Sequence, residues 1–210
     1  ADTDNMLGVT LHDTYGIRRV VGEGGMGRVY EAHHTRIAAK RFAIKVLRAE
    51  MAYSPEVRTR FQREADAAAS IQHPNVIAVN DFGYPPVGRP YIVYDYLDGI
   101  PLSELIFRKK HVEVGIAVYI ARQVCKGLQA AHDKGVIHRD LKPENIYLQG
   151  PTERPDVKVL DFGLSRFMEP TSSQKVTRTG VVMGTPSYMA PEQACGERVD
   201  HRADVYGVGT

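Results

Sequence analysis

The hydrophobic pattern of this chain changes once, near residues 95–100, and that change constrains its fold more than any other feature. Before it, short runs have the alternating, β-branched and aromatic character of strands: YGIRRVV, RVYEAHH, RFAIKVL, NVIAVNDFGY and RPYIVYDYL. After the break at DGIP, apolar residues recur at helical spacing. We therefore expect an α+β chain of two lobes: a polar lead-in at 1–13, a β-rich N-terminal lobe at 14–94 and a helical C-terminal lobe at 95–210.

Two segments have the features of amphipathic helices. In SPEVRTRFQREADAAASIQ, Ser54 is a suitable N-cap and Pro55 suits the first helical position. Glu64 falls on the same face as Phe61, and a carboxylate inside an apolar stripe needs a partner. The second helix is expected in VGIAVYIARQVCKGLQAAHDK, whose apolar residues share one face and which stops at Gly135.

Charge and cysteine content exclude several classes of function. With 27 basic and 25 acidic residues the net charge is +2, which predicts no general attraction to nucleic acid or membranes. The basic stretches at 58–63 and 108–110 are interpreted as solvated faces. Cys125 and Cys195 lack metal-type spacing and favour a reducing, cytoplasmic location. No signal peptide or membrane segment is visible, although a membrane-anchored parent protein stays open.

The stretch VGEGGMGRV contains Gly22, Gly24 and Gly27 in the order G-x-G-x-x-G. Dinucleotide-binding loops of this type are followed by a helix, but here RVYEAHH continues as a strand. A glycine hairpin lets backbone N–H groups approach phosphates, and Val21 and Val29 would flank a flat apolar ligand. An ordinary glycine-rich turn is the alternative.

The strand FAIKVL is apolar on both faces apart from Lys45, so we expect it to be covered on both sides. Lys45 alone could extend its ammonium to solvent. Pairing with Glu64 satisfies both buried charges and directs the ammonium toward the cavity of the glycine loop.

Polar side chains cluster in two loops beside short strands. Asp140, Lys142 and Asn145 lie in HRDLKPEN, and Asp161 begins the next loop in DFG. Two carboxylates and an amide supply the oxygen ligands that suit Mg²⁺ carrying a nucleotide. Any one of these pieces could be an ordinary polar loop, but their joint order argues against that.

The following motifs occur along the chain in this order: GEGGMGRV, AIK, HRDLKPEN, DFG, GTPSYMAPE and DVYGVG. By these motifs, and by their order, residues 15–210 resemble the eukaryotic-like protein kinases, and among them the bacterial Ser/Thr kinases. The resemblance implies a bilobal kinase fold and transfer of the γ-phosphate of ATP to Ser/Thr hydroxyls of protein substrates. It also implies Mg²⁺, or alternatively Mn²⁺, as the metal. A homodimer for autophosphorylation in trans stays open.

The resemblance assigns a role to each polar residue. Lys45, held by Glu64, would contact the α- and β-phosphates, while Asp161 and Asn145 would each hold a Mg²⁺. Asp140 would accept or orient the proton of the substrate hydroxyl.

Other positions would set specificity. Lys142 would reach the γ-phosphate, and with Thr185 it is typical of Ser/Thr rather than Tyr kinases. By the same resemblance, Tyr94 occupies the gatekeeper site and Tyr147 the floor of the adenine pocket, where Met or Leu is more usual. Both tyrosines should narrow the pocket against bulky inhibitors. The remaining adenine contacts are expected from Val21, Val29 and Ala43, from the backbone of Asp95 and Leu97, and from Tyr147 as the floor.

The segment between DFG and APE resembles an activation loop. Thr177 and Thr179 match positions at which bacterial relatives autophosphorylate, and Arg139 beside the catalytic Asp could bind the resulting phosphate. A disordered loop with unmodified threonines is the alternative.

The resemblance also predicts an incomplete C-terminal lobe. Asp204 would support the catalytic-loop backbone, and Glu192 would pair with an Arg beyond Thr210. We therefore expect this chain to be an excerpt of a longer protein that is the active enzyme. The 210-residue excerpt by itself is expected to fold poorly or to act weakly. A non-catalytic nucleotide-binding scaffold is the main alternative, although Lys45 and both key aspartates are intact. A small-molecule phosphotransferase is disfavoured by GTPSYMAPE.

Overall fold

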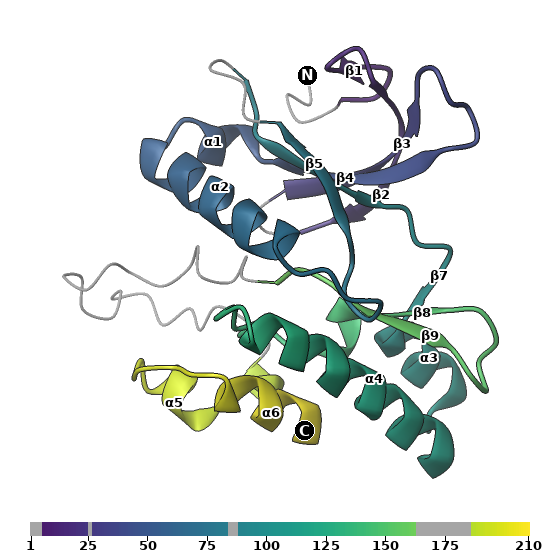
Figure 1. Cartoon of the computed structure of the whole chain (residues 1–210), viewed down its shortest axis with the longest axis vertical. Helices are drawn as coiled ribbons and strands as arrows, with labels where there is room; N and C mark the ends of the chain where they lie inside the picture. Colours follow the sequence, from purple (N-terminus) through teal and green to yellow (C-terminus); the bar gives the residue numbers. More distant parts are fainter. Residues whose placement is uncertain (1–5, 25–26, 84–87, 163–185) are drawn as a thin grey trace. The chain divides into compact units, whose positions relative to one another are not determined.

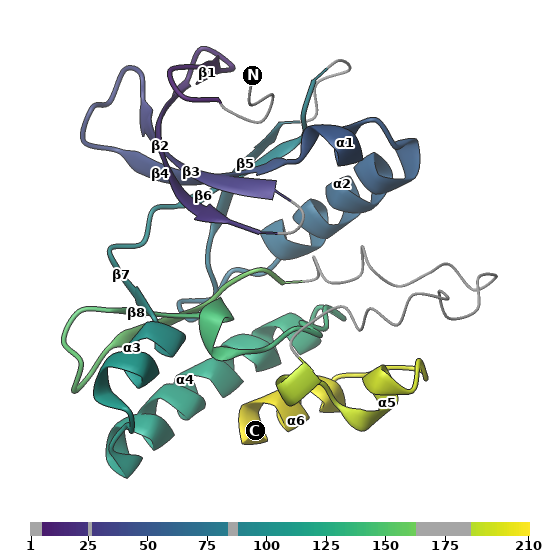
Figure 2. The same cartoon turned by 180° about the vertical axis from the view of Figure 1, so that it is seen from behind.

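A computed structural model describes residues 6–24, 27–83, 88–162 and 186–210, without the side chains of Arg60, Arg63, Glu64 and Pro186. The chain divides into two compact units (Figures 1 and 2). The first combines Ala1–Ala69 with Ala78–Leu97, and the second combines Ser70–Ile77 with Asp98–Thr210. The fold class is α+β, as predicted. The lobe boundaries at 94/95 stay a prediction.

The first unit is built on a six-stranded antiparallel sheet, ordered β1-β2-β3-β4-β6-β5. All three strands expected before residue 48 are present, and the run from Asn75 shortens to β5. The strands are β1 (Thr10–Leu11), β2 (Tyr15–Glu23), β3 (Gly27–His34), β4 (Arg41–Leu47), β5 (Val79–Gly83) and β6 (Tyr91–Asp95). Two helices follow β4: a short α1 (Ala49–Ala52), which the sequence did not predict, and α2 (Pro55–Ala69).

Alternation along β4 gives its two faces different surroundings. Phe42, Ile44 and Val46 are buried in one hydrophobic cluster with residues of β2, β3 and β6. On the other face Ala43 and Lys45 are only half-buried. Leu47, on the same face, is buried. The predicted cover is therefore complete on the first face and only partial at Ala43 and Lys45 on the second.

Helix α2 begins as its sequence predicts. The Ser54 hydroxyl accepts a hydrogen bond from the Val57 N–H at 3.3 Å, and Pro55 takes the first helical position. Phe61 is buried and its ring centroid lies 5.8 Å from that of Phe82 on β5. This aromatic contact anchors α2 to the sheet.

The second unit contains a three-stranded antiparallel sheet and most of the helices. Its elements are β7 (Gly99–Pro101), α3 (Leu102–Lys109), α4 (Val114–His132), β8 (Ile146–Gln149), β9 (Asp156–Val159), α5 (Pro191–Ala194), α6 (Arg202–Gly209) and 3₁₀ turns at Pro143–Asn145 and Pro186–Tyr188. The segment 70–77 joins this unit through β9. The Ile77 N–H donates to the Val159 carbonyl at 3.0 Å, and the Val159 N–H donates to the Asn75 carbonyl at 2.9 Å.

Helix α4 forms the core of the second unit. Its expected apolar face is buried against β8 and β9, and the buried residues are Ile120, Val124, Leu128 and Ala131. At Gly127 the helix approaches the 70–77 segment so closely that a Cβ atom would lie 2.8 Å from the Asn75 carbonyl oxygen. The helix ends at His132, just before Gly135 with its positive φ of 72°.

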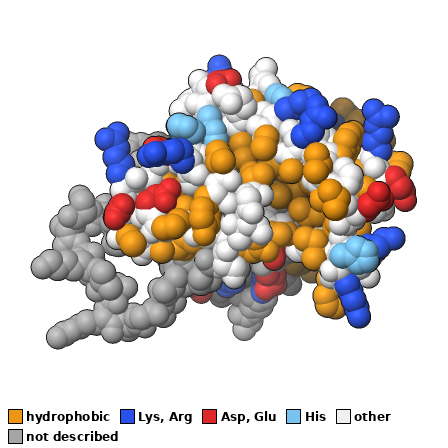
Figure 3. Space-filling model, turned by 90° about the horizontal axis from the view of Figure 1, so that it is seen from below, with side chains coloured by type: hydrophobic (Ala, Val, Ile, Leu, Met, Phe, Trp, Pro, Cys, Tyr) orange, Lys and Arg blue, Asp and Glu red, His pale blue; other side chains and the backbone are white. Residues whose placement is uncertain are grey.

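Some large apolar side chains of the helices are exposed, including Val114 and Val118 on α4 and Val205 on α6. Hydrophobic side chains also gather over the face shown in Figure 3. Surfaces of this kind favour contact with other chains. Within the described part of the chain, none of the helices has the length and hydrophobicity that crossing a membrane requires.

Candidate active site

The glycine stretch forms the turn between β2 and β3, as expected for a strand–loop–strand hairpin. The Gly24 N–H donates to the Gly27 carbonyl at 2.9 Å, and the Arg48 guanidinium donates to the Gly24 carbonyl at 3.1 and 3.3 Å. Both ends of the turn are thus fixed, while residues 25–26 lie outside the described part.

The three glycines of the motif differ in what the fold demands of them. A Cβ atom at Gly27 would lie 2.2 Å from the Val46 carbonyl oxygen, so packing against β4 excludes any side chain there. A Cβ at Gly22 or Gly24 would meet nothing nearer than 3.9 or 3.8 Å, which is ordinary contact. The packing of the described residues therefore explains Gly27 but not Gly22 or Gly24.

Lys45 lies in a row of paired residues that crosses the sheet. Gly22 pairs with Val29, Val29 with Lys45, and Lys45 with Ile92, and directly paired residues share a face. Ile92 in turn pairs with Phe82, which contacts α2. The row therefore joins the glycine turn, the ammonium of β4 and the helix that carries Glu64. The Glu64 side chain lies outside the described part, so the ion pair with Lys45 stays a prediction.

The predicted adenine contacts of the first unit also adjoin this row. Ala43 pairs with Tyr94, and Val21 is 40% exposed at the edge of the glycine turn. The Asp95 N–H donates to the Ala78 carbonyl at 3.2 Å, so that N–H is not available to a ligand. The half-buried Leu97 is the last residue of the unit.

In the second unit the structure brings three of the predicted residues together. The Lys142 ammonium lies 2.8 Å from Oδ2 of Asp140, and the Asn145 amide donates to the Asp140 carbonyl at 2.7 Å. A longer contact of 3.4 Å joins that amide to Asp140 Oδ2. The carboxylate of Asp140 is thus held from two sides while remaining partly exposed.

The loop that carries Asp140 is anchored to buried groups. Asp204, at the start of α6, is 1% exposed and accepts hydrogen bonds from the N–H groups of His138 and Arg139 at 2.9 and 2.8 Å. His132 Nε2 lies 2.7 Å from the same carboxylate and donates to it. A buried carboxylate with three donors is well compensated.

Leu160 connects this loop to the one that begins with Asp161. The His138 Nε2 donates to the Leu160 carbonyl at 2.7 Å, and the Leu160 N–H donates to the Asn145 carbonyl at 2.8 Å. Because a carbonyl only accepts, the proton of His138 is on Nε2, which leaves Nδ1 to accept from the Asp140 N–H at 3.3 Å. The two predicted metal ligands, Asn145 and Asp161, thus flank one fixed residue.

Gln193 is a residue that sequence reasoning missed. Its side-chain amide donates to the Arg139 carbonyl at 2.8 Å, and its carbonyl accepts from the Ala190 N–H at 3.3 Å. Arg139 has a positive φ of 67°, a backbone conformation that residues other than glycine rarely adopt. Arg139 is therefore held by Asp204 through its N–H and by Gln193 through its carbonyl. The only available signal was a Gln directly after the APE motif.

Three of the remaining predicted residues are not described by the structure, and Tyr147 is. Thr177, Thr179 and Thr185 lie outside the described residues. Tyr147, on β8, donates its hydroxyl to the Gly99 carbonyl at 2.8 Å.

Glu192 is half-buried and lines a hollow of about 470 Å³ that also includes Arg202. Asp200, and to a smaller extent Glu192, raise the pKa of the Arg202 guanidinium. The expected Arg partner of Glu192 beyond residue 210 stays untested.

The oxygen atoms of the site fit a hard divalent cation. Because the Asn145 amide nitrogen is engaged by Asp140, its carbonyl oxygen faces the opposite way, and none of the described residues donates to it. Asp161 adds a carboxylate on the adjoining loop. Among the described residues there is no cluster of three or more His, Cys, Asp or Glu that could form an all-protein metal cage. Asn145 and Asp161 together would suit a Mg²⁺ that keeps water or phosphate oxygens as its other ligands.

Comparison with known proteins gives a consistent result. A model of the protein kinase domain matches residues 15–210. The chain is 44% identical over 210 residues to the serine/threonine-protein kinase pkn3 of Myxococcus xanthus, covering 99% of this chain and 38% of pkn3. It is 41% identical to the serine/threonine-protein kinase PknB of Mycolicibacterium smegmatis, covering 95% of this chain and 32% of PknB.

Among solved structures, the PknI kinase domain of Mycobacterium tuberculosis superposes with a TM-score of 0.73 at 33% identity. The match covers 96% of this chain and 73% of that domain. The chain thus spans about a third of the length of the curated relatives and about three quarters of a solved domain.

Proposed function

Because the chain belongs to the protein kinase family and is 41–44% identical to bacterial Ser/Thr kinases, we propose that it transfers the γ-phosphate of ATP to Ser or Thr hydroxyls of protein substrates. The observation that carries this proposal is the group formed by Asp140, Lys142 and Asn145 on a loop anchored by Asp204. A carboxylate held in this way can accept or orient a hydroxyl proton.

The glycine turn supports the binding of phosphates. Of the three glycines in the motif, only Gly27 is required by packing among the described residues, so this packing does not account for the bare backbone at Gly22 and Gly24. Close approach of an oxygen-rich ligand to the turn's backbone N–H groups is the function that bare glycines provide. Lys45, two cross-strand pairs from Gly22, would supply the positive charge for the α- and β-phosphates.

The loop residues divide the work of the transfer step. Asp140 positions the acceptor hydroxyl and takes its proton as the oxygen–phosphorus bond forms and the β–γ bridge breaks. Lys142, 2.8 Å from Asp140, keeps that carboxylate oriented and places an ammonium where the γ-phosphate charge passes. Asn145 and Asp161 would hold Mg²⁺, or Mn²⁺ in its place, and the metal supplies neutralisation of phosphate charge.

Regulation and partners follow from the same proposal. Phosphorylation of Thr177 and Thr179, in trans within a homodimer, would place phosphates near Arg139 and activate the enzyme. Protein substrates with Ser or Thr acceptors are the proposed partners. The cytoplasm supplies ATP and a reducing environment for the two exposed cysteines.

A non-catalytic, nucleotide-binding scaffold is the competing function. Such a protein would keep the glycine turn and Lys45 but would not need a hydroxyl-orienting carboxylate. The tight support of Asp140 by Lys142, Asn145 and the anchored loop favours catalysis.

The test is phosphorylation of a generic basic protein with ATP and Mg²⁺, with phosphosites mapped by mass spectrometry. The Asp140→Asn and Lys45→Met variants should each lose a factor of about 10²–10⁴ in rate. Asp133→Asn, an exposed aspartate beyond α4, is the matched control and should keep full activity. The test uses the protein completed at its C-terminus. The proposal fails if Asp140→Asn phosphorylates as fast as this completed parent, or if the completed parent binds ATP without transferring phosphate.

A further inference from the structure

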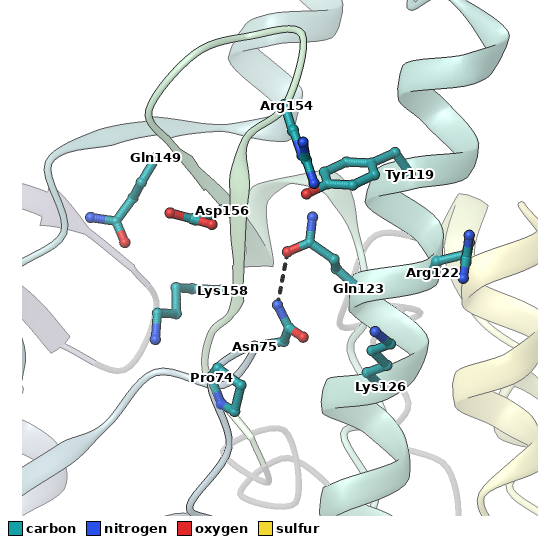
Figure 4. Close-up of a pocket in the computed structure, with 10 residues that line it drawn as sticks. All are labelled: Pro74, Asn75, Tyr119, Arg122, Gln123, Lys126, Gln149, Arg154, Asp156 and Lys158. Atoms are coloured by element: carbon teal, nitrogen blue, oxygen red, sulfur yellow. Dashed lines mark hydrogen bonds between the residues drawn. The ribbon is translucent and has the colours of Figure 1, made fainter.

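The second unit has a basic hollow on the side of α4 and β9, distinct from the residues of the candidate active site. It has a volume of about 620 Å³ and is lined by α4, by the β8–β9 hairpin and by the segment at Pro74 and Asn75 (Figure 4). All three segments belong to the same compact unit, so the hollow is formed within one body.

The floor of the hollow is a hydrogen-bonded amide network. Asn75 is 8% exposed and donates through its amide to Gln123 Oε1 and to the Val157 carbonyl, each at 3.0 Å. Gln123 Oε1 also accepts from the Val157 N–H at 3.2 Å, and its amide donates to the Pro155 carbonyl at 3.0 Å. This network ties α4 to β9 and makes the floor rigid and neutral.

The walls of the hollow are rich in positive charge. Four of its ten lining residues are Lys or Arg, against one carboxylate, that of Asp156, and the four are Arg122, Lys126, Arg154 and Lys158. Among the described residues no ion pair engages any of the four. A chain whose net charge is only +2 therefore concentrates uncompensated positive charge around one rigid hollow.

We propose that this hollow is a docking site for an acidic peptide segment of a protein substrate. The inference rests on the proposed kinase function, because it assigns the site to substrate recruitment. Clusters of Arg and Lys recognise carboxylate-rich segments through charge-assisted hydrogen bonds. Tyr119, which also lines the hollow, adds a phenolic hydroxyl that can donate to a carboxylate.

The arrangement favours an extended acidic segment over a single small anion. In Figure 4 the labelled cations do not converge on one point: Arg154 and Lys126 lie above and below the Asn75–Gln123 pair, while Lys158 and Arg122 extend from β9 and α4 away from it. Carboxylates spaced along a peptide can each meet one cation, whereas one phosphate or sulfate ion could meet few of them. Asp156, on the β9 side, would repel a carboxylate placed next to it and so select the spacing of the acidic residues.

The test measures binding of a fluorescein-labelled decapeptide of alternating Glu and Gly by fluorescence anisotropy, without ATP. The same peptide with Gln in place of Glu is the comparison ligand, and a ten-nucleotide single-stranded RNA is a second one. The pocket variant is Lys126→Gln/Arg154→Gln. The control variant, Arg36→Gln/Lys134→Gln, makes the same change of net charge at exposed positions outside the hollow.

The parent chain and the control variant should bind the Glu peptide equally, and the pocket variant should bind it roughly tenfold more weakly. Attached to a Ser substrate, the Glu peptide should lower KM but leave kcat unchanged. Equal binding by both variants, equal binding of the Gln peptide, or tighter binding of RNA would overturn the inference. Because this binding assay needs no ATP, a parent chain that binds the Glu peptide but transfers no phosphate would count against the proposed function and not against docking. Asp140→Asn should bind the peptide as the parent does.

Discussion

Arg139, directly before Asp140, has a backbone conformation that the surrounding residues hold in place. Its φ of 67° is unfavourable for a residue with a side chain, yet hydrogen bonds of 2.8 Å fix both its N–H and its carbonyl. Since Asp140 follows directly, any relaxation of Arg139 would rotate the carboxylate that we propose to orient the acceptor hydroxyl. Gln193 is therefore expected to act as a positioning residue through Arg139.

Replacing Gln193 should consequently change the rate constant more than the affinity for ATP. Gln193→Ala removes the donor to Arg139, and Gln193→Glu keeps an acceptor for Ala190 but cannot donate. Both variants should lower kcat about tenfold with KM for ATP unchanged, since misplacing a reacting group costs rate. Steady-state kinetics give the split between the two constants. Gln129→Ala, an exposed amide on α4, is the control, and equal kcat in all the variants would show that Gln193 does not position Asp140.

The glycines of the β2–β3 turn make a second prediction at single positions. Gly27→Ala should lower the free energy of unfolding by about 1–3 kcal/mol, because its methyl would collide with the Val46 carbonyl. Gly24→Ala should leave stability within about 0.5 kcal/mol of the parent but raise KM for ATP, because the methyl would occupy space that a phosphate approaches. Thermal unfolding and ATP titration measure the two effects. Opposite assignments, with Gly24→Ala the less stable variant, would contradict this division.

At the scale of elements, strong periodicity made the long segments predictable. The three strands before residue 48, the Ser54 cap of α2 and the buried face of α4 were all expected from the sequence and are present. The short α1 and α3 were not predicted, because four to eight residues give too little periodic signal. The sequence predicts residues 75–77 in a strand of the first lobe, but Val76 pairs with Val159 of the second unit, which local sequence cannot reveal.

The candidate site shows the same limit. The residues to which we assign the chemistry, such as Asp140 and Asn145, are recognisable by type and spacing, and the structure places these two in contact. The anchors of their loop are recognisable only in part, because a hydrogen bond from Gln193 to Arg139 depends on how distant segments pack. No periodicity or local motif encodes such a contact.

Helix α4 offers a matched pair of glycines with opposite expected effects. Gly127→Ala would place a methyl 2.8 Å from the Asn75 carbonyl and should destabilise the protein by about 1–3 kcal/mol. Gly115→Ala, in the first turn, meets only a Glu113 side-chain oxygen at 3.8 Å and should stabilise by about 0.5–1 kcal/mol through helix propensity. Urea unfolding of both variants checks the prediction, and a loss of stability in Gly115→Ala would contradict it.

For the whole molecule, alkaline pH should act on the first unit, because two of its described tyrosines, Tyr15 and Tyr91, have raised pKa values. Burial, followed by the hydrogen bond to Asp81, raises the pKa of Tyr15, and burial raises the pKa of Tyr91 to about 12. A raised folded-state pKa stabilises fully below the unfolded value of about 10 and loses that contribution as pH rises through the folded value. The free energy of unfolding should therefore fall above about pH 10.

Urea unfolding followed by circular dichroism across this pH range measures the decline. The Tyr15→Phe/Tyr91→Phe variant should lose less stability with pH than the parent, although it starts lower for want of the bond to Asp81. Tyr53→Phe, at an 85% exposed position, should leave the decline unchanged. If the units unfold in separate transitions, only one of them should shift with pH. A decline that is identical in the double variant would rule out these tyrosines as its cause.

The membership of residues 70–77 has a practical consequence for evolution and for engineering. The polypeptide leaves the first unit after Ala69, returns at Ala78 and leaves again after Leu97. Neither half can therefore be excised by a single cut, since a fragment ending at 97 would retain Val76 and Ile77 stripped of their β9 neighbour. Recombination between related genes at a single crossover would separate residues 70–77 from a β9 that matches them. A chimera that takes residues 70–77 and β9 from the same parent would keep their pairing.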